Sequence, residues 1–166
     1  MATKPKKRFA LDANILFDLA EERDYASTLR EMLQELGAVL EVPPTVIQEL
    51  VFAARKIAGN QGETALVALQ SIRAWNLVPI KLLPVEHGIA KAFAERLIRK
   101  GYLPENEAND GLLLAQAALG QIPVLITRDQ HLLDIPSGAL AAELNAADLF
   151  QIHTMHPRPL LKALAH

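Results

Sequence analysis

Four acidic residues lie where a parallel α/β fold would bring carboxylates together. One ends the first apolar run of the chain, one follows a later apolar run, and two lie in the first turns of expected helices. In that order they are Asp12, Asp129, Glu49 and Asp110. Open α/β sheets have their sites just beyond the carboxyl ends of the strands. If the four side chains converge there, their oxygens form a pocket suited to Mg²⁺ or Mn²⁺.

Each acid also has a structural explanation when it is taken alone. Asp12 and Asp129 are suited to capping the helices that follow them. Glu49 and Asp110 lie near helix N-termini, where the helix dipole favours a negative charge. The combination favours a site, because crowded carboxylates repel one another and their pKa values rise unless a cation neutralises them.

Four other residues accompany the acids. Asn14 and Thr127 are short polar side chains that could orient water or a ligand at the same edge of the sheet. Arg128 adjoins the fourth acid, and this strand-end position makes it the best candidate for a phosphate contact among scattered basic residues. Glu107 lies one turn before the third acid on the same helix face.

The composition sets limits on the class of protein. The chain has 166 residues, of which 51% are hydrophobic, a net charge of -2 and no cysteine. We expect a single domain over residues 1–166, with a core over about 8–150 and a tail, 151–166, that no pattern places. The lack of cysteine excludes disulfides and thiolate metal sites. No apolar run approaches the length of about 20 residues that spans a membrane, and we expect a cytoplasmic protein without membrane contact.

Alternation of apolar strands with helices predicts one mainly parallel sheet covered by helices on both faces. Strands are expected over 9–12, 38–42, 78–83 and 122–127, with a weak last strand over 139–144. Helices are expected from 13, from 24 or 27 to 36, from 45, and over 63–75, 85–100, 105–119, 129–133 and 146–150. Thr45 and Gln48 match a capping box at the start of one helix. The Ala- and Leu-rich helices could bury a homodimer face or receive a partner helix.

Four segments together resemble the PIN-domain family of metal-dependent ribonucleases. They are LDANIL at 11–16, VIQEL at 46–50, NDGLLLA at 109–115 and VLITRD at 124–129. By position, the four acids match the family's four acids in order, and Asn14 and Thr127 match its polar companions. Glu107 falls where some members have an additional acid. The resembling part runs from residue 8 to about 134 and covers most of the chain.

The resemblance implies a three-layer α/β/α sandwich, Mg²⁺ or Mn²⁺ as cofactor, and single-stranded RNA as substrate. Many bacterial members of the family are VapC-like toxins of toxin–antitoxin pairs, which implies an antitoxin protein as a partner. Two stretches depart from compact toxins of this kind. Residues 59–84 contain an additional helix, and the tail beyond Phe150 has no recognised motif.

Two other functions stay open at this point. The chain could be a catalytically silent PIN-like module that binds RNA or protein, although all four acids are present. It could also be a Mg²⁺-dependent phosphatase of the haloacid-dehalogenase type. Such enzymes have a second aspartate two residues after the first, where this chain has Asn14.

Overall fold

The computed structural model describes residues 4–56 and 58–166. Five parallel strands form one sheet in the order β3-β2-β1-β4-β5. The strands are β1 (Arg8–Leu11), β2 (Val39–Val42), β3 (Leu77–Pro79), β4 (Val124–Ile126) and β5 (His153–Met155). The helices are α1 (Ala13–Ala20), α2 (Asp24–Glu35), α3 (Pro44–Lys56), α4 (Asn60–Ser71), α5 (Pro84–Arg99), α6 (Ala108–Leu119), α7 (Gln130–Leu133), α8 (Ser137–Ala146) and α9 (Pro157–Leu164).

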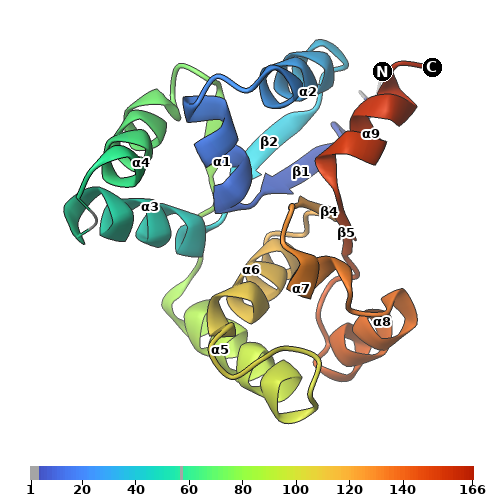
Figure 1. Cartoon of the computed structure of the whole chain (residues 1–166). Coiled ribbons are helices and arrows are strands. Elements are labelled where there is room, and N and C mark those ends of the chain that lie inside the picture. The colour runs from blue at the N-terminus through green and yellow to red at the C-terminus, as the bar shows by residue number, and fades with distance from the viewer. Residues whose placement is uncertain (1–3, 57) are drawn as a thin grey trace.

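The central strands form because their apolar side chains are buried on both faces of the sheet. Ala10 and Leu11 of β1, and Leu125 and Ile126 of β4, are almost fully buried. Helices α1, α2 and α9 lie on one side of the sheet and α5 to α8 on the other, while α3 and α4 pack together beside α1 (Figure 1). The predicted α/β/α arrangement with a parallel sheet is therefore confirmed. Pro79 ends the edge strand β3, as expected for a residue that cannot donate to a ladder.

The order of the strands decides which residues can meet. Because β1 and β4 are neighbours at the centre of the sheet, the residues after Leu11 and Ile126 lie side by side. Register between β4 and β5 pairs Ile126 with Met155, so the residues after β5 lie at the same edge. Asp12, Thr127 and His156 are thus the first residues beyond three adjacent strands.

Close packing of α5 and α6 sets the position of the third acid. A Cβ atom on Gly111 would lie 2.7 Å from both the Cα and the Cβ of Ala94. Only glycine therefore permits this approach of the two helices. Because Gly111 directly follows Asp110, the contact also fixes where that acid enters the edge of the sheet.

Several predicted elements are wrong in position or type. Residues 139–144 belong to α8 rather than to a strand, and the last strand is instead β5, in the tail. No helix covers 146–150, since α8 ends at Ala146. Helix α6 begins at Ala108 rather than at 105, because Glu107 N–H closes a turn onto the Pro104 carbonyl. The other predicted bounds differ from the observed ones by a few residues, with α4 ending at Ser71 and β3 at Pro79.

The predicted capping box at Thr45 is also wrong. Helix α3 begins at Pro44, a residue well suited to a first helical position. The Thr45 hydroxyl oxygen instead accepts a hydrogen bond from Gln116 Nε2 at 2.8 Å, and Thr45 N–H donates to Gln116 Oε1 at 3.1 Å. Thr45 therefore joins α3 to α6, the two helices that carry Glu49 and Asp110. Within the described residues, every helix is too short or too polar to cross a bilayer.

Candidate metal centre

Asp12 joins the end of β1 to the start of α1. It is 4% exposed, and its Oδ1 accepts the N–H of Ala13 at 2.6 Å, so it does act as the helix cap. Its other oxygen accepts a hydrogen bond from the hydroxyl of Thr127 at 2.7 Å. Asp12 therefore caps α1 with one carboxylate oxygen and contacts the residue after β4 with the other.

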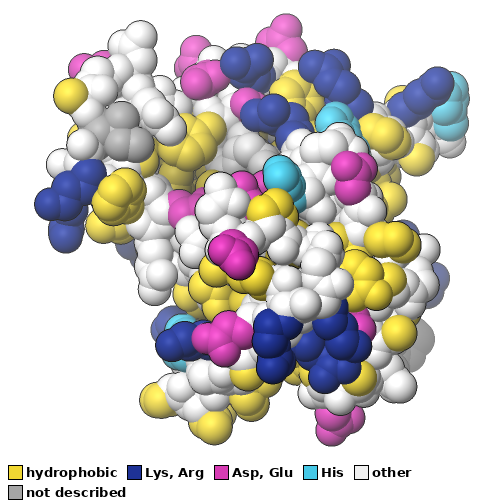
Figure 2. All heavy atoms as spheres, turned by 60° about the horizontal axis from the view of Figure 1, so that its bottom comes forward, with side chains coloured by type: hydrophobic (Ala, Val, Ile, Leu, Met, Phe, Trp, Pro, Cys, Tyr) yellow, Lys and Arg dark blue, Asp and Glu magenta, His cyan; other side chains and the backbone are white. Residues whose placement is uncertain are grey.

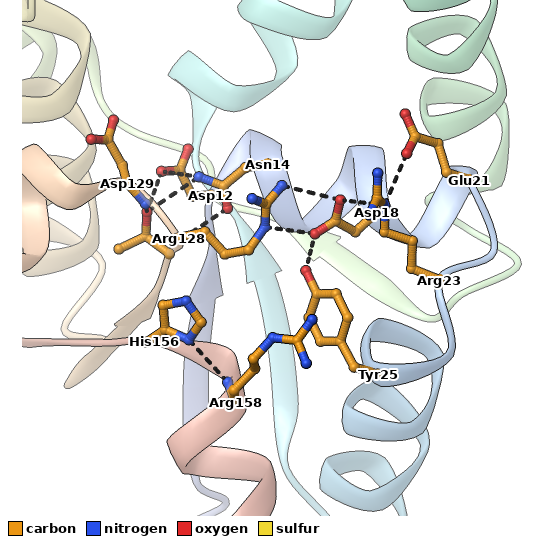
Figure 3. A network of polar contacts seen from close by, with 11 residues as sticks. Asp12, Asn14, Asp18, Glu21, Arg23, Tyr25, Arg128, Asp129, His156 and Arg158 are labelled. Carbon is orange, nitrogen blue, oxygen red and sulfur yellow. Dashed lines mark hydrogen bonds and ion pairs between the residues drawn. The ribbon is translucent and has the colours of Figure 1, made fainter.

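Thr127 and Asn14 connect the first acid to the fourth. The Thr127 hydroxyl oxygen accepts the N–H of Asp129 at 2.9 Å and lies 3.3 Å from Asn14 Nδ2. Asn14 Nδ2 also lies 3.3 Å from Asp12 Oδ2 (Figure 3). Asp129 in turn caps α7, since its Oδ1 accepts the N–H of His131. These contacts hold the two strand-end acids in a fixed relation.

Three acids lie close enough to share one cation. A carboxylate oxygen from each of Glu107, Asp110 and Asp129 lies within 4.8 Å of the other two. Asp110 is 5% exposed, and its Oδ2 is a buried oxygen without a hydrogen-bond partner among the described residues. A buried and unpaired carboxylate oxygen is costly in a folded protein. A cation at this place would supply the missing interaction.

Glu49 reaches the same edge from α3. Its Oε1 accepts a hydrogen bond from Asn109 Nδ2 at 3.2 Å, and both residues line a cavity of about 680 Å³. Acidic side chains gather at a hollow in the middle of the face shown in Figure 2. Asn109 received no role from the sequence, although it directly precedes the third acid.

Burial and mutual repulsion raise the pKa values of three of these acids. Burial, followed by the charge of Asp12, raises the pKa of Glu49 to about 7. Burial and the neighbouring Asp129 raise the pKa of Asp110 well above its ordinary value. Burial also raises the pKa of Asp12, against the hydrogen bonds from Thr127 and Ala13 N–H. The structure thus brings all four acids, with Glu107, to one edge of the sheet.

This arrangement fits a hard divalent cation. Carboxylates are the ligands that Mg²⁺ and Mn²⁺ prefer, and among the described residues none of these acids has a lysine or arginine at ion-pair distance. The unpaired oxygen of Asp110 is the observation that favours such an ion most directly. Without a cation, the raised pKa values mean that some of these groups hold protons near neutral pH.

The side chain of Arg128 does not lie among the acids. Its backbone N–H donates to Asn14 Oδ1 at 3.1 Å, and its guanidinium pairs with Asp18 at 2.7 and 3.1 Å. Asp18 is 2% exposed and was missed by the sequence analysis. A signal for it exists, because Asp18 lies four residues after Asn14 and so shares its face of an otherwise apolar helix.

Comparisons with known proteins agree with this geometry. The sequence-family model of the PIN domain matches residues 9–138 of this chain. Among solved structures, a chain in the crystal structure of VapBC2 from Rickettsia felis bound to a promoter DNA fragment has a TM-score of 0.59 and 17% identity. The match covers 89% of this chain and 98% of that one. A chain of FitAcB from Neisseria gonorrhoeae has a TM-score of 0.52 and 14% identity, with 90% and 98% covered. These likenesses show a shared fold. A search of curated sequences finds no match.

Proposed function

The chain belongs to the PIN domain family, and from this we propose that it is a metal-dependent endoribonuclease that hydrolyses single-stranded RNA. The observation that carries the proposal is the buried Asp110 oxygen, which has no hydrogen-bond partner in the described part of the chain and lies in a group of acids whose pKa values are raised. Repulsion among these acids destabilises the fold when no cation is bound. A cation bound between them would offset that repulsion. The family match also favours a nuclease over a phosphatase.

Asp12, Glu49, Asp110 and Asp129 would hold Mg²⁺ or Mn²⁺, with Glu107 as an additional acid. A cation of this kind increases the acidity of water and stabilises negative charge on phosphate oxygens. The protein's own contribution is orientation. Thr127 holds one oxygen of the Asp12 carboxylate and the backbone N–H of Asp129, while the carboxylate of Asp129 is held by the N–H of His131. Asn109 restrains Glu49 in the same way.

Cleavage of a labelled single-stranded RNA, with Mn²⁺ and with EDTA, tests the proposal. We expect the unaltered chain to cut only with the metal, and Asp12→Asn to abolish cutting while thermal unfolding stays cooperative. Asp148→Asn is the matched control, because Asp148 is exposed, precedes β5 at the opposite edge of the sheet, and has a positive φ that asparagine tolerates. Undiminished cleavage by Asp12→Asn defeats the mechanism.

We also propose that the chain acts as the toxin of a toxin–antitoxin pair, with an antitoxin protein as its partner. The fold shared with a chain of VapBC2 supports this role. Co-expression with the product of a small adjacent reading frame tests it, since an antitoxin is expected to co-purify and to suppress cleavage. Light scattering of the purified chain reports whether its Ala- and Leu-rich helices bury a homodimer face, the alternative to their receiving a partner helix.

The alternative is a silent module that keeps the fold for RNA or protein contact. Calorimetric titration with Mn²⁺ separates the two functions, because a silent module has no need of the metal. Binding of Mn²⁺ that is lost in Asp110→Asn supports the nuclease. RNA binding without any Mn²⁺ binding or cleavage supports the silent module.

A further inference from the structure

A second polar network lies beside the acids, around Asp18 of α1, the helix that Asp12 caps. Asp18 in α1 is almost fully buried and accepts two hydrogen bonds from the guanidinium of Arg128, from Nε at 2.7 Å and from the second nitrogen at 3.1 Å. Bidentate pairing of this kind fixes both the position and the plane of the arginine. Arg128 is therefore held twice by one face of α1: Asn14 accepts its backbone N–H, and Asp18 accepts from its guanidinium.

Two residues at the start of α2 contact the same carboxylate. Arg23 Nε lies 3.2 Å from Asp18 Oδ1, and the hydroxyl of Tyr25 donates to Asp18 Oδ2. The guanidinium of Arg158, in α9, lies over the Tyr25 ring with its central carbon 5.0 Å from the ring centre. Figure 3 shows these side chains as one continuous group that runs from Asp129 to Arg158.

The network places its negative charge inside and its positive charges outside. The Asp18 side chain is 3% exposed, whereas those of Arg128 and Arg23 are 40% and 58% exposed. The guanidinium groups of Arg23 and Arg128 pair with the carboxylates of Asp18 and Glu21, and Arg158 on the Tyr25 ring adds a further positive charge, so these five side chains sum to a formal charge of about +1. Within residues 4–56 and 58–166, Arg158 has no carboxylate at ion-pair distance. Arg23, Arg128 and Arg158 are called the basic cluster below.

The basic cluster lies at the same edge of the sheet as the acids. Arg128 is next to Asp129 beyond β4, and Arg158 follows the neighbouring strand β5. In Figure 2, basic side chains gather above the acidic side chains in the central hollow. A chain with a net charge of -2 therefore carries positive charge beside its candidate metal centre.

We propose that the basic cluster binds phosphates of the substrate strand on one side of the phosphate that meets the acids, and that Asp18 is the positioning residue for Arg128. The ligand class is the phosphodiester backbone of a single-stranded nucleic acid, and the inference rests on the proposed nuclease function. Guanidinium groups suit it because their planar forks match phosphate oxygens. Arg158 lies beyond residues 9–138, so this part of the cluster comes from outside the segment that matches the family.

The test is the salt dependence of RNA binding by the full chain. Anisotropy of a labelled single-stranded oligoribonucleotide is measured in EDTA, so that no strand is cut. Each lost phosphate contact reduces the slope of log affinity against log salt by about 0.7. We expect this reduction, with a several-fold loss of affinity, for Arg158→Ala. Arg158→Lys is expected to retain the slope, because it keeps the charge while losing the planar stack on Tyr25.

The matched control is Arg73→Ala, which removes the same charge from an exposed residue before β3, at the opposite edge of the sheet. An unchanged slope in Arg158→Ala, an equal loss in Arg73→Ala, or a complete lack of RNA binding by the unaltered chain overturns the proposal. A purely structural role of Arg158 would lower the unfolding temperature of both Arg158 variants and leave the slope unchanged.

A double-mutant cycle tests the role of Asp18. Asp18→Asn is expected to weaken RNA binding, and to do so much less when Arg128→Ala is already present, because only the contact with Arg23 is then left to lose. Additive losses contradict the positioning role. Cleavage with Mn²⁺, measured in parallel, separates the two hypotheses. Slope changes without any cleavage leave the basic cluster standing and defeat the nuclease, whereas cleavage with an unchanged slope does the reverse.

Discussion

Asp110 and Glu143 are equally buried carboxylates that have opposite surroundings. Glu143, in α8, is 5% exposed and pairs with Arg96 of α5 and, at 2.7 Å, with Lys100, which directly follows that helix. These two cations lower its pKa. Asp110 is also 5% exposed, but it faces Asp129 and Glu107, and its pKa is raised. The structural acid Glu143 thus forms ion pairs with basic side chains of the chain itself, whereas a cation for the acids of the candidate metal centre would come from solution.

The difference should be largest in activity. Asp110→Asn is expected to lower Mn²⁺-dependent RNA cleavage by at least about 100-fold, since loss of a residue that only supports a ligand already costs 10–100-fold. Glu143→Gln is the counterpart, because it removes a charge of equal burial from a site with its own cations. We expect it to retain cleavage and to lose stability. Equal loss of cleavage in both variants would remove the distinction.

Thr127→Val tests whether the acids depend on orientation. The change removes the hydroxyl that donates to Asp12 and accepts from Asp129 N–H, while it keeps the shape of a fully buried side chain. We expect cleavage to fall by about 10–100-fold, as for other residues that orient metal ligands. Wild-type rates at saturating Mn²⁺ would show that the acids hold their places without this hydroxyl.

Gly111→Ala should disturb one carboxylate and spare the other. The added Cβ would meet the Ala94 backbone, and overpacking of this kind costs about 1–3 kcal/mol. Because Gly111 follows Asp110, the affinity for Mn²⁺ should also weaken, while the pair between Glu143 and α5 persists. Urea unfolding and calorimetry measure the two effects. Gly138→Ala, whose added Cβ meets nothing within 4 Å, is the control: it should leave the Mn²⁺ affinity unchanged and stabilise the fold slightly, by about 0.4–1 kcal/mol, since it lies in α8.

The smallest expected effect is a pH dependence of stability in EDTA. When folding raises the pKa of an acidic group, the folded protein loses stability as the pH rises from the unfolded to the folded pKa of that group. For Glu49 this window runs from its ordinary value, 4.5, to about 7, and Asp12 and Asp110 change stability in the same direction. The unfolding temperature should therefore fall over this range in EDTA and recover with Mn²⁺. A temperature that rises with pH in EDTA contradicts the model of uncompensated acids.

The parallel sheet and the convergence of the acids could be predicted from the sequence because both depend on local patterns of residues. Apolar runs at β1 and β4 are buried on both faces, and a residue that follows such a run lies at the sheet edge whatever the rest of the chain does. The strand β5 carried no such signal, since His153, Thr154 and Met155 are all at least partly exposed. The Ala- and Leu-rich run at 139–144 suited a strand or a helix equally, and it folded as α8.

Partners that are distant in sequence were the other limit. Arg128 was expected to face phosphate because it adjoins Asp129, but its guanidinium pairs with Asp18, which is 110 residues away. Nothing local indicates that choice, since it depends on β1 and β4 being neighbours. Thr45 likewise binds Gln116 rather than its own helix terminus, across 71 residues. Whether Arg128 also contacts substrate stays a prediction.

The place of β5 has a practical consequence for shortened versions of the chain. The family match ends at residue 138, which invites removal of the last segment. A version that stops at Phe150 would leave β4 as a bare outer strand, with its backbone donors and acceptors open to other molecules. Such exposed edges promote self-association. We expect the shortened protein to precipitate on expression, and a screen for crystals or inhibitors should keep residues 151–166.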